Sequence, residues 1–393
     1  MNYPEYVRRI LGEIDQAGYE AFVVGGSVRD FLLEKPSHDY DITTSALPEE
    51  TAQLFKEYNV IKTGIKHGTV TVVVCRHPVE ITTYRVDGDY RDSRHPSKVN
   101  FTRCLEEDLA RRDFTVNAMA YNDKRGLVDL FDGVGDLKKK LIRAVGDPEK
   151  RFEEDALRIM RAFRFCSKLN FDIEEETLAA AESCRQGLLN ISVERKTAEL
   201  EGILLGAGAK KALALMHSAR IFEVIAPSLS LDISRFSVIS LLPKDFACRM
   251  AFCLVGQDTY EEYLSALRLS NAVLSKAKKL IRLSETRFDL PSDRELRRFM
   301  SKCGDDFEDV LMIRSALGEN INGIKERANK IKKQGDCLYL SQLKADGRVL
   351  AELGIRGKEV GDTLSYLLEM VLDNPTLNEQ KALIELVKKE KNL

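Results

Sequence analysis

Hydrophobic positions in the first 140 residues follow the patterns of both helices and strands. Apolar side chains recur at helical spacing between residues 4 and 17, on Tyr6, Ile10, Leu11 and Ile14, which predicts an amphipathic helix. The apolar run 21–24 predicts a short buried strand, and a helix is predicted to follow over 27–33. Alternating or continuous apolar positions predict further strands over 39–43, 69–75 and 79–85.

After about residue 141 the strand patterns nearly disappear and helical periodicity continues to the end of the chain. The first helices predicted there cover 148–168, 175–185, 194–205 and 209–219. This change of pattern is the clearest domain boundary in the sequence. It predicts an α+β protein in which an N-terminal domain with a mixed sheet precedes an all-α remainder.

The overall charge provides no attraction for a polyanion. The 393 residues include 60 Lys or Arg and 62 Asp or Glu, which gives a formal net charge of −2. A nucleic-acid partner would therefore have to be bound by a local basic surface. The absence of Trp and the aromatic content of only 7% argue against base-stacking platforms as the main binding device.

The eight cysteines include no CxxC pair, and the closest two, Cys248 and Cys253, have no histidine nearby. We therefore expect free thiols in a reducing compartment, without a zinc site. The first residues are polar, and no apolar run reaches the roughly 18 residues that span a membrane. These features predict a cytoplasmic protein with no membrane partner.

Two acidic residues, Asp39 and Asp41, stand two apart on a predicted strand. Residues i and i+2 of a strand point to the same side, so the two carboxylates would repel each other unless a cation lay between them. Oxygen ligands of this kind suit Mg²⁺, which also binds substrate phosphates. A pair of charges on an exposed strand edge is the alternative.

The surrounding residues favour the metal site. Gly25 and Gly26 end a strand and begin a helix, where backbone N–H groups can approach a phosphate. Arg29 follows within one helical turn and could bind a terminal phosphate. Glu80 on a neighbouring predicted strand could bind the metal on the side of the nucleophile, accept its proton, or be a surface charge. A triphosphate and Mg²⁺ held in this way outline a site for phosphoryl transfer.

The segment Gly25-Gly26-Ser27-Val28-Arg29-Asp30, followed by Asp39-Tyr40-Asp41, resembles the signature of the class II CCA-adding enzyme and bacterial poly(A) polymerase family of nucleotidyltransferases. Residues 107–115 (EDLARRDFT) resemble the RRDFT motif of that family, and residues 154–158 (EDALR) resemble its nucleotide-selecting EDxxR motif. The similarity is continuous over about 19–205 and looser near 347–357.

This resemblance implies a polymerase-β-like nucleotidyltransferase head with the mixed sheet at 1–140, a helical neck at 141–205 that selects the nucleotide, a helical body at 206–320 and a helical tail at 321–393 that binds tRNA. It implies Mg²⁺ as the cofactor, bound by Asp39 and Asp41. Glu80 stays a third catalytic candidate from its place on the neighbouring predicted strand. The nucleotide-binding residues that it implies are Gly25, Gly26, Arg29, Arg112, Asp155, Arg158, Arg161 and Arg164.

The chemistry of the neck residues agrees with this role. Asp155, Arg158, Arg161 and Arg164 are spaced by three along the helix predicted over 148–168, so they are expected to be neighbours. An Asp only accepts and an Arg only donates hydrogen bonds, and cytosine and adenine both offer an amine donor beside a ring-nitrogen acceptor. Uracil and guanine present the reverse pattern. On a lone helix, these charges would more simply form surface ion pairs.

The resemblance implies template-independent addition of C, C and A to the 3′ end of tRNA, with CTP and ATP as substrates and the acceptor arm of tRNA as the partner. No stable protein partner is implied. Family members that add only CC resemble deletions of the loop at 87–96, so its presence here favours addition of the final A. The alternatives are an A-adding enzyme, a poly(A) polymerase and, from another class, a non-catalytic RNA-binding protein on the same fold.

Overall fold

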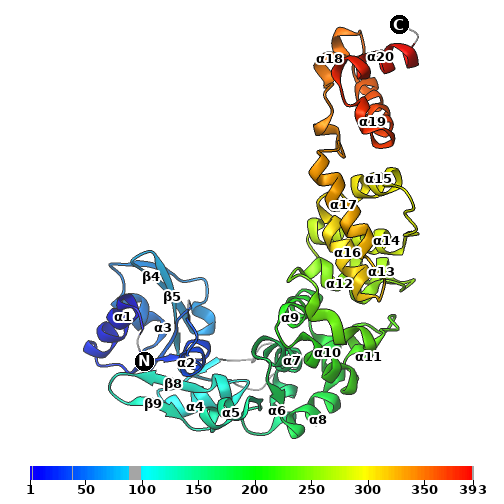
Figure 1. Ribbon diagram of the computed structural model, residues 1–393. Helices are drawn as coiled ribbons and strands as arrows, with labels where there is room; N and C mark the ends of the chain where they lie inside the picture. Colours follow the sequence, from blue (N-terminus) through cyan, green and yellow to red (C-terminus); the bar gives the residue numbers. More distant parts are fainter. Residues whose placement is uncertain (2, 38, 88–98, 392–393) are drawn as a thin grey trace. The chain divides into compact units, whose positions relative to one another are not determined.

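The computed structural model describes residues 1, 3–37, 39–87 and 99–391 (Figure 1). The chain forms two compact units. The first contains Met1–Phe236 and Glu262–Leu269, and the second contains Ser237–Glu261 and Ser270–Leu393. The prediction of an α+β protein is confirmed, because the large sheet lies near the N-terminus and helices dominate from α6 onwards. The predicted division into head, neck, body and tail stays a prediction.

A seven-stranded mixed sheet organises the first unit. Its strand order is β3-β4-β5-β2-β1-β8-β9, in which only the pair β2 and β5 is parallel. Valines on alternate positions of β4 are buried, as a strand with one face on a core requires. The strands are β1 (Ala21–Val24), β2 (Asp41–Thr44), β3 (Asn59–Ile61), β4 (Thr69–Val74), β5 (His77–Thr83), β8 (Met119–Asn122) and β9 (Gly126–Asp129).

One predicted strand begins later than expected. The prediction placed both Asp39 and Asp41 on a strand over 39–43, but β2 starts at Asp41 and Asp39 precedes it. The pairing of β2 with β5 fixes the position of the third carboxylate, because Asp41 is directly opposite Glu80 in the register. The parallel pairing of strands distant in sequence thus brings these two acidic residues together.

Two short strands, β6 (Arg85–Asp87) and β7 (Val99–Phe101), pair antiparallel next to the large sheet. Most of the loop at 87–96, whose presence favours addition of the final A, lies outside the described residues. Two further short strands, β10 (Leu141–Ile142) and β11 (Asp172–Ile173), pair parallel after the predicted boundary.

The helices of the first unit surround this sheet and continue beyond it. They are α1 (Glu5–Gln16), α2 (Gly26–Leu32), α3 (Pro48–Leu54), α4 (Leu105–Ala110), α5 (Gly133–Lys139), α6 (Pro148–Glu154), α7 (Leu157–Leu169), α8 (Glu175–Ser183), α9 (Val193–Leu205), α10 (Ala209–Ser218) and α11 (Phe222–Ile225). The amphipathic helix predicted at the N-terminus is confirmed, with Val7, Ile10, Leu11 and Ile14 buried. Its hydrophobic face therefore supports the sheet from the start of the chain.

The helix predicted over 148–168 was wrong as a single element. It is interrupted at Asp155, whose backbone is extended (φ −143°, ψ 101°), so that α6 and α7 are separate. The Asp155 carboxylate accepts a hydrogen bond from the backbone N–H of Leu157 at 3.0 Å, as a helix-capping aspartate does. An aspartate that binds the backbone in this way favours the start of a new helix over continuation of the old one.

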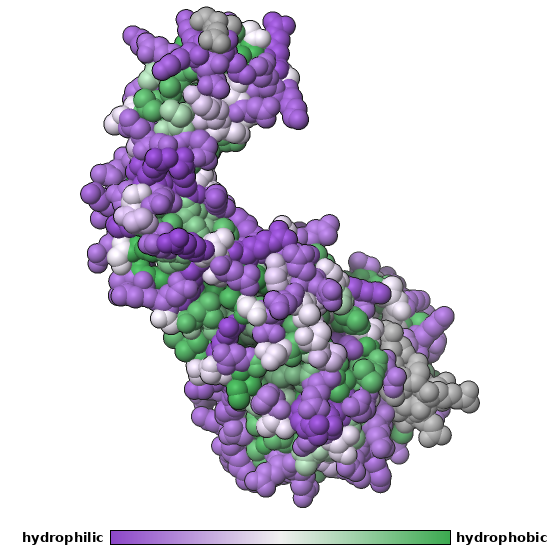
Figure 2. Space-filling view, turned by 90° about the vertical axis from the view of Figure 1, so that its right-hand side faces the viewer, coloured by the Kyte–Doolittle hydropathy of each residue, from purple (hydrophilic) through white to green (hydrophobic). Residues whose placement is uncertain are grey.

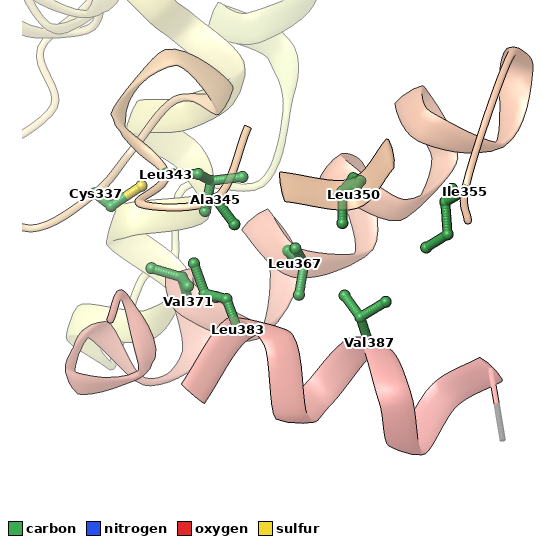
Figure 3. Packing of buried hydrophobic residues seen from close by; sticks show 9 residues of the cluster. All are labelled: Cys337, Leu343, Ala345, Leu350, Ile355, Leu367, Val371, Leu383 and Val387. Atoms are coloured by element: carbon green, nitrogen blue, oxygen red, sulfur yellow. The ribbon is translucent and has the colours of Figure 1, made fainter. Parts of the chain in front are cut away.

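The second unit is entirely helical in its described residues. Its helices are α12 (Phe246–Leu254), α14 (Asn271–Glu285), α15 (Asp293–Cys303), α16 (Phe307–Ala316), α17 (Asn322–Gln334), α18 (Gly347–Glu352), α19 (Lys358–Asp373) and α20 (Gln380–Lys391), while α13 (Tyr260–Ala266) has residues in both units. Figure 3 shows a core of α18, α19, α20 and the preceding segment, in which Leu350, Leu367 and Val387 point toward one another and are almost fully buried. This core gives the C-terminal segment its own packing.

Hydrophilic residues cover most of the face in Figure 2, with hydrophobic residues interspersed. All eight cysteines are free thiols, as predicted, and five of them are buried. None of the helices in the described residues combines the length and apolar character needed to cross a membrane.

Candidate active site

One cleft of about 560 Å³ in the first unit gathers ten of the eleven residues that the sequence singled out. They come from the β1–α2 junction, the facing strands β2 and β5, the segment after α4, and the start and body of α7. These residues are Gly25, Gly26, Arg29, Asp41, Glu80, Arg112, Asp155, Arg158, Arg161 and Arg164. Residues almost 140 positions apart in the sequence therefore meet in one place.

The eleventh residue, Asp39, lines a neighbouring hollow of about 490 Å³. Gly26, Arg29 and Asp41 line both hollows, so Asp39 is next to the cleft even though it does not line it. Asp39 precedes β2, so the alternation of side chains along a strand does not fix the direction of its side chain.

The cleft is strongly cationic although the whole chain is slightly acidic. Eight of its lining side chains are Arg or Lys and only four are Asp or Glu. The cleft can therefore attract an anionic ligand locally, despite the net charge of the chain.

The carboxylates at the base of the cleft repel one another. Crowding by surrounding protein atoms, together with the charges of Glu80 and Asp39, raises the pKa of Asp41, although Arg112 acts in the opposite direction. Asp41 is nevertheless an exposed residue at the start of its strand and lines the cleft. Within the described part of the chain, no three His, Cys, Asp or Glu side chains already converge on one point as a metal cage.

The two glycines allow close approach at the β1–α2 junction. Gly25 has a positive φ of 69°, which favours glycine, and a Cβ there would lie 3.3 Å from Nη1 of Arg112. A side chain at Gly25 would thus push Arg112 away from the glycine turn.

Arg29 is almost completely buried at the wall of the cleft, with 2% of its surface exposed. Its guanidinium forms an ion pair with Asp30 at 2.8 Å and donates a hydrogen bond to Oδ1 of Asn117 at 2.7 Å. These contacts hold the charge of Arg29 in one orientation before any ligand binds.

A fully buried carboxylate, Asp108 on α4, positions two arginines of the cleft. It accepts hydrogen bonds from Arg111 at 2.7 Å, from Arg112 at 3.2 Å and from the hydroxyl of Thr43 on β2 at 3.1 Å. Burial alone would raise the pKa of Asp108, but the guanidinium groups of Arg112 and Arg111 outweigh it and hold that pKa below its usual value. Asp108 therefore ties the arginine-bearing segment to the strand that carries Asp41.

Asp113 holds Arg161 of α7 in the same way. Arg161 donates to Oδ2 of Asp113 from both Nε, at 2.8 Å, and Nη2, at 2.5 Å. The carboxylate raises the pKa of Arg161, and the guanidinium lowers the pKa of Asp113 despite the burial of that group. This pair joins the RRDFT segment to α7.

Arg164 packs between an acid, an aromatic ring and a glycine. It forms an ion pair with Glu199 of α9 at 2.5 Å, and its guanidinium lies 4.4 Å from the centre of the Phe165 ring. A Cβ on Gly202 would come within 2.6 Å of Cδ of Arg164, so the absence of a side chain at 202 leaves the space that Arg164 occupies.

Asp155 and Arg158 both line the cleft, but not as successive members of one helix, which corrects the predicted spacing. Asp155 precedes α7 and forms an ion pair with Arg195 of α9 at 2.9 Å. Arg158 pairs with Glu154 and donates to the backbone oxygens of Arg151 at 3.0 Å and Arg111 at 3.2 Å. The pair is thus positioned by a helix break and by contacts from three segments.

The sequence matches two family models over parts of its length and known proteins over nearly all of it. Residues 21–143 match the poly(A) polymerase head domain, and residues 170–232 match a domain described as the probable RNA- and SrmB-binding site of polymerase A. A CCA-adding enzyme of Lactobacillus delbrueckii subsp. bulgaricus is 39% identical over 390 residues, covering 96% of this chain and 95% of the relative. The chain belongs to the CCA-adding enzyme family.

Other members of the CCA-adding enzyme family agree with this assignment. The enzyme of Pediococcus pentosaceus is 36% identical and is covered over 98% of both chains. The crystal structure of the Bacillus stearothermophilus CCA-adding enzyme in complex with CTP superimposes with a TM-score of 0.81 at 32% identity, and the match covers 100% of both chains.

Several cleft residues were not identified from the sequence. Asp113 lies within the matched motif, yet its pairing with Arg161 depends on the fold that brings it to α7. Asp108, in the same motif, supports Arg111 and Arg112 without lining the cleft itself. Asn117 and Arg195 carry no sequence signal of their own, because their contacts with Arg29 and Asp155 are made across the fold.

Replacement of Asp108 by Ala should lower the free energy of unfolding by about 3 kcal/mol, because two guanidinium groups and a buried hydroxyl lose their shared acceptor. Urea unfolding followed by circular dichroism measures the change. Glu107→Ala, on the same helix but exposed, is the control and should cost about 0.5 kcal/mol or less. Equal losses in the two variants would contradict the role of Asp108.

Glu80→Gln should raise the free energy of unfolding at pH 7.5 in the presence of a chelator, by about 1 kcal/mol or less, because Asp41 loses a repelling charge. The raised pKa of Asp41 destabilises the fold above that pKa, and the cost disappears as protonation proceeds at lower pH. The gain should therefore shrink between pH 7.5 and pH 4.5. An exposed control, Glu201→Gln, should show neither the gain nor this pH dependence.

Proposed function

We propose that this protein adds C, C and A to the 3′ end of tRNA without a nucleic-acid template, using CTP and ATP and releasing pyrophosphate. The observation that carries the proposal is the cationic cleft, in which ten residues selected by sequence motifs meet. The near full-length similarity to named CCA-adding enzymes supports it. These relatives do not favour the alternatives of a poly(A) polymerase, an A-adding enzyme or a non-catalytic protein.

The carboxylates of Asp39, Asp41 and Glu80 fit a divalent cation, which we propose to be Mg²⁺. All three are hard oxygen donors, and the pKa of Asp41 is raised by burial and by the charges of Glu80 and Asp39, whose repulsion a cation would relieve. When bound there, the cation would favour ionisation of the attacking 3′ hydroxyl and neutralise charge on the phosphates. Glu80, directly opposite Asp41 in the register, is a candidate to bind it or to accept the hydroxyl proton.

The arginines of the cleft are the proposed partners of the triphosphate. Gly25 and Gly26 leave room for phosphate oxygens beside the backbone, and Arg29 and Arg112 lie at the same turn. The buried Nε of Arg112 has no hydrogen-bond partner among the described residues, and a ligand oxygen would satisfy it. Because their acidic partners already hold the arginines, little reorganisation is needed when charge develops on the phosphates.

Asp155 and Arg158 are the proposed protein template for the base. Asp155 would accept a hydrogen bond from the exocyclic amine of C or A, and Arg158 would donate to the ring nitrogen. Uracil or guanine would face both groups with the wrong polarity, at a cost of about 1–3 kcal/mol for each unpaired group. The ion pair of Asp155 with Arg195 at 2.9 Å holds the carboxylate in place.

The division into four parts that the resemblance implies belongs to the same proposal. Residues 1–140 would perform catalysis and residues 141–205 would select the nucleotide. Residues 206–320 would form the body, and residues 321–393 would bind the acceptor arm of tRNA. The separate hydrophobic core of α18, α19 and α20 supports a tail that folds around its own apolar residues. A cytoplasmic location is also proposed, because all eight cysteines are free thiols.

The test is an incorporation assay with purified protein, Mg²⁺ and tRNA that lacks its terminal CCA. Labelled CTP should be incorporated alone, and ATP only after CTP has been supplied. Asp41→Ala should reduce incorporation by about a thousandfold or more, in line with the loss of a catalytic electrostatic contact, while tRNA binding is retained. Long tracts of A would instead identify a poly(A) polymerase, incorporation of A only onto a CC end would identify an A-adding enzyme, and no incorporation would identify a non-catalytic protein.

Asp155→Ala should relax base choice more than it slows transfer. The ratio of kcat/KM for CTP to that for UTP should fall by about tenfold or more, because the amine of C loses its acceptor. The control is Asp172→Ala, an exposed aspartate outside the cleft, which should leave the ratio unchanged. An unaltered preference for C and A in Asp155→Ala would contradict the template role.

A further inference from the structure

Lys168, in the last turn of α7, lines both the nucleotide cleft and the neighbouring hollow that contains Asp39. The other residues that line both are Gly26, Arg29 and Asp41. These three are the proposed partners of the phosphates and of the metal. Lys168 therefore stands where the phosphates and the cation would meet.

The helix directs Lys168 to this place. Arg161, Phe165 and Lys168 are separated by four and three positions, so they follow one face of α7. Arg161 and Phe165 line the cleft as well. Lys168 thus extends the cationic side of α7 by one turn beyond Arg164, toward the carboxylates.

Lys168 also differs from the arginines of the cleft in its ion pairs. Each of the seven arginines that line it has a carboxylate partner, in Asp30, Asp108, Glu154, Asp113, Glu199 or Asp155. Among the described residues no acidic side chain forms an ion pair with Lys168. An ammonium group at the edge of a cationic cleft, without a carboxylate of its own, is suited to bind an anionic ligand.

The charges around Lys168 also favour the binding of an anionic ligand. Burial lowers the pKa of Lys168, and the nearby charges of Arg29, Arg164 and Lys35 lower it further, whereas Asp30 raises it. Cations are crowded at this point and have too few anions to balance them. A polyphosphate would supply the missing negative charge.

We infer that Lys168 contacts the terminal phosphates of the bound nucleoside triphosphate and stabilises the pyrophosphate as it leaves. This inference deepens the proposed function and rests on it. In the step concerned, the 3′ hydroxyl gives up its proton, to Glu80 or to solvent. Its oxygen forms a bond to the α-phosphorus while the bond from that phosphorus to the bridging oxygen breaks. The electron pair of the broken bond stays on pyrophosphate, where the added charge lies near the Lys168 ammonium. A lysine suits this place because its point charge can follow the phosphates on a flexible stem.

The test compares Lys168→Met and Lys168→Arg with the wild-type protein in direct binding of CTP, ATP and CMP. Lys168→Met should weaken binding of CTP and ATP by the same factor, about tenfold or more, and leave CMP binding unchanged. Its inhibition by pyrophosphate should weaken by a similar factor. Lys168→Arg should keep most of the affinity. The matched control is Lys210→Met, an exposed lysine on α10 that lines neither hollow.

Three outcomes would overturn the inference. Lys168→Met could bind CTP as the wild type does, lose CTP and CMP equally, or lose affinity for tRNA with unchanged affinity for CTP. The last result would assign Lys168 to the RNA backbone. A wild-type protein that transfers no nucleotide from CTP would instead overturn the proposed function, so the two failures are distinguishable.

Discussion

The arrangement of the cleft depends on buried carboxylates that hold arginines in place. The eight cationic side chains of the cleft would repel one another without nearby negative charge. The buried carboxylates supply that charge. Asp108 on α4 binds Arg111 and Arg112, and Asp113 binds Arg161 of α7. Both acids are buried, while the three arginines line the cleft.

These ion pairs also connect separate parts of the first unit. Asp108 accepts a hydrogen bond from Thr43 on β2, the strand that begins with Asp41. The same carboxylate therefore contacts both the strand that carries Asp41 and the arginines of the cleft. Asp113 joins the segment after α4 to α7, and Glu199 joins α7 to α9. A site assembled in this way is oriented before ligand binding, and such preorganisation is the main source of electrostatic catalysis. The carboxylates of Asp41 and Glu80 are the exception, since they lie opposite each other with unrelieved repulsion.

The helix break at Asp155 shows that the contacts of one side chain can interrupt a helix that the hydrophobic pattern predicts. The apolar positions from 148 to 168 suit one long helix, and the sequence offers no glycine or proline at the break. The Asp155 side chain nevertheless captures the N–H of Leu157, and its other carboxylate oxygen binds Arg195 of α9. The contact from α9 is tertiary, so local pattern analysis had no means to detect it. Similarly, Asp39 fell outside β2 because only pairing with neighbouring strands decides where a strand begins.

The sequence by itself determined the α+β class, the amphipathic N-terminal helix, the strand-glycine-helix turn at Gly25 and Gly26, and the eleven candidate site residues, ten of which meet in one cleft. These features are local, because periodicity and the conformational freedom of glycine act within a few residues. Only the tertiary structure decided that Glu80 is opposite Asp41, that Asp113 holds Arg161, and that Lys168 reaches the hollow beside Asp39. Those relations join segments far apart in the chain, and their energies depend on packing, burial and charge that exist only after folding.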